Sequence, residues 1–209
     1  MANREVMITP GANQAYAAAL LATCDPEDEV VLFAPYYFSH LVAIQLLGLK
    51  PLVLPCTAAS GLPDVDALRA ALSRPGSRVR AVTLVNPSNP SGAVSDATHT
   101  SEVLSACAEG GAWLIADEAY EHFVHGVAED GKALSAGGRS DNGLASPHQD
   151  GHPERGRMQP STPHVGFASA GSALCQPSLA DGVIHLHTFS KSFGLAGWRV
   201  GSLCYPRAL

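Results

Sequence analysis

The 209-residue sequence lacks the charge pattern and the cysteine spacing of several specialised protein classes. Its formal net charge is −6 and no Lys/Arg cluster stands out, so the positive field expected of a nucleic-acid-binding protein is absent. The five cysteines are scattered and include no Cys-x-x-Cys pair, which argues against a disulfide framework and against a zinc site. We therefore expect neither a nucleic-acid partner nor a metal.

Long apolar runs are also missing. The first ten residues contain no apolar core of the kind found in secretory signals. The most apolar stretch, residues 41–55, is interrupted by Gln45, Lys50 and Pro51, which is unfavourable for a membrane span. We expect no membrane association and, by default, a cytoplasmic protein. The apolar share of 46% is that of an ordinary globular domain, and the chain is long enough to bury a core.

What the sequence does contain is a regular alternation of helix-like and strand-like segments. Each predicted strand is a short apolar run of the kind that a parallel sheet buries on both faces. We predict helices over residues 11–24, 40–47, 64–72 and 95–108, and strands over residues 29–33, 51–55, 79–85, 112–116, 183–187 and 199–205. This order of elements predicts an α/β fold.

Residues 127–182 differ in composition from the rest of the chain. Gly, Ser, Pro, Asp and His are frequent there, and a periodic apolar pattern is almost absent. A structureless stretch of this length is unusual inside a compact domain. We interpret it as a disordered insertion, or as an artefact of the gene model, within one domain that spans residues 1–209.

The strongest chemical signal is the segment from His187 to Gly201, which follows directly on a predicted buried strand. In an isolated Ser-Lys pair the lysine usually lies in a surface turn. Here we expect Lys191 to be at least half-buried, which disfavours the charged ammonium and makes the amine nucleophilic toward an aldehyde. Thr188 and Ser190 provide hydroxyl groups, and Arg199 provides a planar fork that suits a phosphate.

Two further motifs follow predicted strands. Residues 113–120 (Trp-Leu-Ile-Ala-Asp-Glu-Ala-Tyr) place Asp117 at a strand end and Tyr120 three positions later. The alternative is a helix that begins with acidic residues. Residues 86–92 (Asn-Pro-Ser-Asn-Pro-Ser-Gly) follow another strand and include Asn89, although the same letters are compatible with a plain double turn.

A possible anion site lies at the first predicted helix. Residues 9–15 resemble a helix start, and the N–H groups of Gly11, Ala12 and Asn13 would be unpaired there, which favours a phosphate. A plain helix cap is the alternative.

An aromatic segment follows the second predicted element. Residues 34–40 (Ala-Pro-Tyr-Tyr-Phe-Ser-His) come directly after a strand. Tyr37, or failing that Tyr36, could stack on a flat ligand, whereas a core tyrosine is the alternative. His40 ends the segment.

Taken in this order, the five motifs resemble the class I and II aminotransferases, fold-type I enzymes that depend on pyridoxal 5′-phosphate (PLP). The resemblance covers residues 8–206 apart from the insertion. It implies a three-layer α/β/α large domain with a mainly parallel central sheet. It also implies that Lys191 forms the Schiff base with the cofactor and that Lys191, Asp117 and Tyr120 act in catalysis.

The resemblance assigns a role to each remaining candidate. Asp117 would hold a proton on the pyridine nitrogen, because the cofactor is an electron sink only when that nitrogen is charged. Asn89 and Tyr120 would contact the phenolic oxygen, and Tyr37 would stack on the ring. The expected phosphate contacts are Gly11, Ala12, Asn13, Ser190 and Arg199. His40 and Thr188 would contact these cofactor-binding residues and not the cofactor itself, and His40 would form a hydrogen bond with Asp117.

The resemblance also implies a reaction and partners. The expected reaction moves an amino group between an amino acid and a 2-oxo acid, in an enzyme that is a homodimer. Family members have a C-terminal small domain with an arginine for the substrate carboxylate, and we expect that domain to be missing here. Carbon–sulfur lyases and cyclopropane-carboxylate synthases share these motifs, so a related PLP enzyme is one alternative. A truncated, non-catalytic remnant is the other.

Overall fold

The computed structural model describes residues 4–124 and 181–209. The predicted insertion, residues 127–182, lies outside these ranges except for its last two residues. Within the described part of the chain, no helix is long and apolar enough to cross a membrane.

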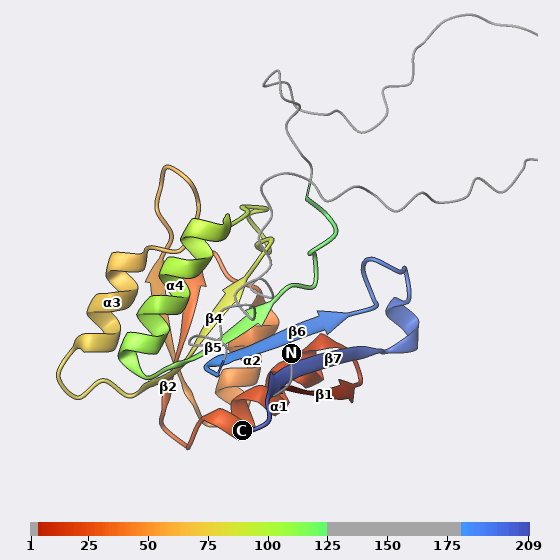
Figure 1. The fold of residues 1–209 in the computed structure, drawn as a ribbon, viewed down its shortest axis with the longest axis horizontal. Helices are drawn as coiled ribbons and strands as arrows, with labels where there is room; N and C mark the ends of the chain where they lie inside the picture. Colours follow the sequence, from red (N-terminus) through yellow and green to blue (C-terminus); the bar gives the residue numbers. More distant parts are fainter. Residues whose placement is uncertain (1–3, 125–180) are drawn as a thin grey trace, which may run out of the picture. The chain divides into compact units, whose positions relative to one another are not determined.

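A seven-stranded sheet forms the centre of the described residues (Figure 1). The strands are β1 (Arg4–Thr9), β2 (Glu29–Ala34), β3 (Lys50–Pro55), β4 (Val79–Val85), β5 (Trp113–Asp117), β6 (Val183–Thr188) and β7 (Gly201–Pro206). Their order in space is β1-β7-β6-β5-β4-β2-β3. The strands from β2 to β6 pair in parallel, and only β7 runs antiparallel to its neighbours β6 and β1. The predicted α/β fold with a mainly parallel sheet is confirmed.

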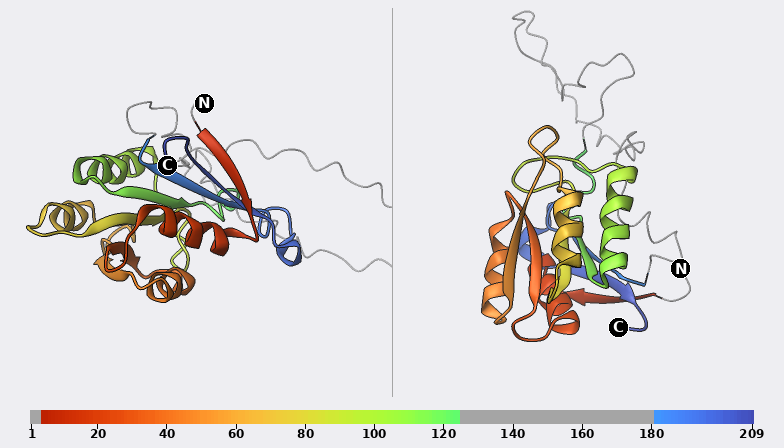
Figure 2. Two further views of the ribbon diagram at one scale, coloured as in Figure 1. Left: turned by 90° about the horizontal axis from the view of Figure 1, so that it is seen from below. Right: turned by 90° about the vertical axis from the view of Figure 1, so that its left-hand side faces the viewer.

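Two layers of helices cover the sheet, and Figure 2 shows them on opposite sides of it. The helices are α1 (Ala12–Thr23), α2 (Phe38–Leu46), α3 (Val65–Ser73) and α4 (Ala97–Gly110). Local sequence explains where two of them begin. Asp64 accepts a hydrogen bond from the backbone N–H of Ala67 and so caps α3, and Asp96 caps α4 in the same way.

Each face of the sheet has its own apolar core. Under α3 and α4 the strands contribute residues such as Val82, Leu84 and Leu114, which pack against Leu68 and Leu104 of the helices. The other core contains, among others, Leu20, Ile44, Ile115, Ile184 and Leu186, and it lies under α1 and α2. Full burial of one such side chain stabilises a fold by about 1.5–3 kcal/mol, so both layers contribute to stability.

One strand was not predicted from the sequence. β1 lies at the edge of the sheet, four of its six residues are exposed, and only Thr9 is buried. An edge strand with so little burial has no regular apolar pattern, and its partner β7 is at the other end of the chain. The remaining differences are shifts of element ends. A short 3₁₀ helix, η1 (Ala196–Trp198), precedes β7, which begins at Gly201, two residues after the predicted start of the strand.

Candidate active site

The fold brings the five motifs to one edge of the sheet. Parallel strands end on the same side, and ligands in open α/β sheets bind at that side. β7 runs in the opposite direction, so its first residue, Gly201, pairs with the last residues of its neighbours, Thr188 of β6 and Thr9 of β1. The segments before β7 and after β1 therefore lie at the same edge as the ends of β4, β5 and β6.

A cavity of about 350 Å³ lies at this edge, which is within the usual range of small-molecule sites. Most of the residues proposed from the sequence line it: Ala12, Asn13, Tyr37, Asn89, Asp117, Tyr120, Thr188, Ser190, Lys191 and Arg199. Val85, Ala119 and Ala196, which the sequence did not indicate, complete the wall. Gly11 and His40 do not line the cavity, but each contacts a residue that does.

The start of α1 and the side chain of Arg199 form a positively polarised corner of the cavity. No side-chain cap occupies the N-terminus of α1 within the described residues, and its first turn has no acidic residue. Its first N–H groups are therefore available to an anion. A Cβ added to Gly11 would lie 2.5 Å from Nη2 of Arg199, so only glycine permits this approach. Gly11 also has a φ of 81°, which favours glycine.

Arg199 is held in an unusual backbone conformation. Its φ is 52°, in the left-handed region, which costs about 1–3 kcal/mol for a residue with a side chain. The residue follows η1, and Nη1 donates a hydrogen bond of 2.9 Å to the carbonyl oxygen of Ala196. The strained turn thus directs the guanidinium toward Gly11 and the start of α1.

Asp117 is a buried carboxylate with fixed orientation. One oxygen, Oδ1, accepts a hydrogen bond of 3.0 Å from the N–H of Ala119, and Oδ2 lies 3.1 Å from Nε2 of His40. The side chains of Asp117 and His40 are only 8% and 2% exposed. The alternative of an acidic helix start is wrong, because Asp117 is the last residue of β5 and a turn follows it. Nε2 of His40 and Oδ2 of Asp117 are thus within hydrogen-bond distance, which is compatible with the predicted contact.

Lys191 lines the cavity beside Tyr120. Its Nζ is 5.3 Å from the centroid of the Tyr120 ring, within the range of a cation–π contact. Lys191 is exposed in this structure. The residue is in a turn after β6, beside an open cavity, and therefore keeps contact with solvent.

The loop after β4 and the segment after β2 form the remaining walls. Asn86, at the start of the loop, is buried, and its side chain both donates to and accepts from the backbone of Ser95. The loop is therefore a closed turn that also presents Asn89 to the cavity. Tyr37 lines the cavity and Tyr36 does not, which favours Tyr37 as the stacking residue.

A chain of acidic and imidazole groups beside the cavity was missed in the sequence. Glu118 and His185 are buried, with Oε2 and Nε2 2.5 Å apart, and His185 also contacts His187. Nδ1 of His187 lies 3.4 Å from Glu121, and this contact raises the pKa of His187. Burial acts to raise the pKa of Glu121, but His187, His122 and His185 together lower it. The alternation of His185 and His187 along β6 was the available signal.

Comparison with known proteins identifies the family. The whole chain, residues 1–209, matches the family model described as aminotransferase class I and II. The chain belongs to this family. The class I and II aminotransferases are PLP-dependent.

Individual relatives agree with this assignment. The chain is 29% identical over 210 residues to the aromatic aminotransferase ISS1 of Arabidopsis thaliana, and the match covers 100% of this chain and 42% of that protein. It is 28% identical to a solved aspartate aminotransferase from Rhizobium meliloti, with a TM-score of 0.71, over 98% of this chain and 41% of the other. A solved methionine aminotransferase, YbdL from Escherichia coli, gives 25% identity and a TM-score of 0.70, over 98% and 42% of the two chains. The chain thus spans about two fifths of the length of these relatives.

Proposed function

We propose that the protein transfers an amino group between an amino acid and a 2-oxo acid, with PLP held in the cavity at the edge of the sheet. One observation carries the proposal. Asp117 at the end of β5, and Lys191 and Arg199 from the segment between β6 and β7, line the same cavity. Membership of the aminotransferase family supports the same reaction.

The residues present fit PLP in charge and in space. Its phosphate would lie at the start of α1, where Gly11 leaves room beside Arg199 and Ser190 is near. Its ring nitrogen would face Asp117, and Tyr37 would stack on its ring. Asn89 and Tyr120 would contact the phenolic oxygen, and Lys191 would bind the aldehyde carbon. When bound, PLP supplies an electron sink that stabilises charge at the substrate Cα.

The side chains of this protein would then orient the reactants and move one proton. Lys191, with a long flexible stem, would be displaced from the cofactor by the substrate amine and would then act as the general base for the proton at the substrate Cα. Asp117 would keep a proton on the opposing ring nitrogen, because its carboxylate is buried and held in place by Ala119 and His40. In its charged form, Lys191 would be held beside the cavity by the cation–π contact with the ring of Tyr120.

A transfer assay separates this function from the alternatives. We would load the chain with PLP and supply a ¹⁵N-labelled amino acid together with an unlabelled 2-oxo acid. Phenylalanine and aspartate are the first donors to try, since aromatic and aspartate aminotransferases are among the relatives. We expect ¹⁵N in the amino acid formed from the 2-oxo acid, and no transfer by the Lys191→Ala variant.

Other outcomes would favour other functions. Release of ammonia or of a thiol, without transfer of ¹⁵N, would favour the carbon–sulfur lyases, and a cyclic product would favour the cyclopropane-carboxylate synthases. PLP binding with no turnover by any donor would favour the non-catalytic remnant. Each result contradicts the proposed amino-group transfer.

We also propose that the protein is a homodimer, as the family resemblance implies. Support comes from large apolar side chains that are exposed on α1 and α2: Leu21 is 66%, Phe38 68% and Leu46 81% exposed. Sedimentation equilibrium tests this directly. A chain that is monomeric at all concentrations and in the presence of PLP would contradict it.

A further inference from the structure

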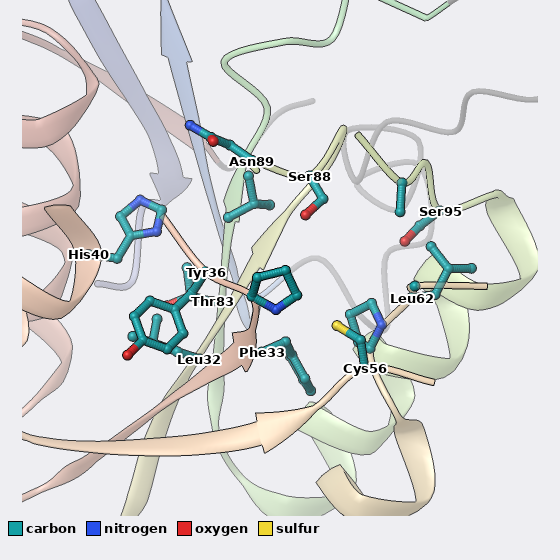
Figure 3. A pocket seen from close by; sticks show the side chains of 15 residues that line it. Leu32, Phe33, Tyr36, His40, Cys56, Leu62, Thr83, Ser88, Asn89 and Ser95 are labelled. Atoms are coloured by element: carbon teal, nitrogen blue, oxygen red, sulfur yellow. The ribbon is translucent and has the colours of Figure 1, made fainter. Parts of the chain in front are cut away.

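A second, much smaller cavity adjoins the candidate active site, and Asn89 lines both cavities. Its volume is about 20 Å³, and its lining includes His40, Thr83, Ser88, Asn89 and Ser95 (Figure 3). A cavity needs about 10–15 Å³ to hold one water molecule, together with two to four polar partners. This cavity therefore has the size and the lining for a single water.

His40 connects the two cavities through its two ring nitrogens. Nε2 lies 3.1 Å from Oδ2 of Asp117, which lines the larger cavity. Nδ1 is buried and has no hydrogen-bond partner among the described residues. In Figure 3 the imidazole of His40 lies at the wall of the small cavity, with one nitrogen directed toward the other lining side chains. Buried polar atoms are almost always paired, so Nδ1 indicates a ligand in this cavity.

The contact with Asp117 decides which kind of partner Nδ1 needs. A carboxylate only accepts hydrogen bonds, so Nε2 must carry the proton that it donates to Oδ2. In a neutral imidazole the other nitrogen is then an acceptor, and it requires a donor. The tautomer of a histidine is set by the hydrogen bond that each nitrogen makes, so a donor at Nδ1 would fix the proton on Nε2.

Thr83 is a second buried polar residue in the lining of the small cavity. The Thr83 hydroxyl lies 2.8 Å from the hydroxyl of Tyr16. Burial raises the pKa of Tyr16 far above its ordinary value, so the phenol stays protonated and can donate to Thr83. A hydroxyl makes up to three hydrogen bonds, which leaves Thr83 able to accept from a water in the cavity.

We propose that the small cavity holds one water molecule that donates to Nδ1 of His40 and to the hydroxyl of Thr83, and thereby fixes the His40 tautomer that Asp117 requires. His40 is in this account a positioning residue, since it acts through Asp117. The water site is a property of the cofactor-free chain. Only its consequence, a fixed orientation of Asp117 toward a ring nitrogen, rests on the proposed function.

The test is ¹⁵N NMR of histidine-labelled chain without cofactor, with the His40 signals assigned by comparison with His40→Gln. We expect Nε2 to carry the proton and Nδ1 to be an unprotonated, hydrogen-bonded acceptor. In Thr83→Val the Nδ1 resonance should shift toward that of an acceptor without a partner. Tyr16→Phe is the matched control, because it removes the same bond to Thr83 but leaves the cavity lining intact. Its Nδ1 resonance should stay close to that of the parent.

A crystal structure at high resolution gives a second measurement that needs no variant. One ordered water within hydrogen-bond distance of Nδ1 and of Thr83 supports the proposal. A dry cavity, a direct protein donor to Nδ1, a proton on Nδ1, or equal shifts in Thr83→Val and Tyr16→Phe would overturn it. All of these results are independent of PLP, so loss of cofactor binding or of transfer would count against the proposed function alone.

Discussion

The two faces of the sheet differ in what they bury. On the face covered by α3 and α4, the core consists of apolar side chains such as Leu84, Leu104 and Leu114. On the face covered by α1 and α2, Tyr16 and His40 introduce polar atoms at 1% and 2% exposure. His40 then reaches Asp117 at the cavity. One face therefore stabilises the fold by packing, while the other face also positions a reactive carboxylate.

The largest expected effect is on the packing face. Leu104→Ala should lower the free energy of unfolding by about 2–5 kcal/mol, because it leaves a cavity in a closely packed core. The folded fraction should bind PLP as the parent does, since Leu104 is remote from the site in the fold. Denaturant unfolding and PLP titration measure the two quantities. A large loss of PLP affinity in fully folded protein would remove the distinction between the faces.

The next largest effect is expected on the affinity for PLP and not on the free energy of unfolding. Arg199→Ala should weaken PLP binding by about ten- to a hundredfold, since a charge-assisted hydrogen bond is worth about 1.5–3 kcal/mol. Affinity for pyridoxal, which lacks the phosphate, should not change, and this comparison is the control. Equal losses for PLP and pyridoxal would mean that Arg199 does not bind the phosphate. Fluorescence titration gives both constants.

A smaller effect is expected for the buried hydrogen bond between Tyr16 and Thr83, on the side of the sheet covered by α1 and α2. Tyr16→Phe keeps the ring and removes the hydroxyl that bonds to Thr83, so it should destabilise the chain by about 1 kcal/mol. Tyr205→Phe is the matched control, because the Tyr205 hydroxyl is at the surface, 3.4 Å from Glu5. Equal unfolding free energies for the two variants would contradict a stabilising role for the buried pair.

The smallest effect is the pH dependence from His187 and Glu121. The pKa of His187 is raised above 6.5, so its contribution to stability is complete below pH 6.5 and is lost as the pH rises through the raised value. The pKa of Glu121 is lowered below 4.5, so its contribution is complete above pH 4.5 and is lost as the pH falls through the lowered value. The stability difference between parent and His187→Gln should thus be largest between these two pH values.

We expect that difference to be about 0.2–1 kcal/mol, as for other partly exposed ion pairs. Unfolding in denaturant at pH 5.5, 8.5 and 3.5 measures it. A difference that grows toward pH 8.5 would have the wrong sign. His122→Gln is a control, since its imidazole contacts the same glutamate from a more exposed position.

The sequence indicated most of the residues that line the cavity, but it did not indicate the edge strand β1. Asp117, Asn89 and Lys191 could be found because each follows a buried apolar strand, and parallel strands end at one edge of the sheet. β1 could not be found, because an exposed edge strand depends on hydrogen bonds to a distant partner and not on its own pattern.

Contacts between segments that are far apart in the sequence could not be predicted either. The close approach of Gly11 to Arg199 depends on a left-handed turn before β7, which no local pattern indicates. The buried side-chain contact between Glu118, which directly follows β5, and His185 of β6 is another example. It depends on the register of the two strands, which the sequence does not show. The exposure of Lys191 likewise depends on how open the cavity is and not on the residues beside it in the sequence.

The central claim is that these segments assemble one PLP site around Lys191. We would incubate the 209-residue chain with PLP, reduce with borohydride, and locate the pyridoxyl group by peptide mapping. The account predicts a single label on Lys191, which is lost in Lys191→Ala and retained in Lys50→Ala, a variant at an exposed lysine paired with Glu27. The absence of a label, or a label spread equally over Lys50, Lys132 and Lys191, would contradict it.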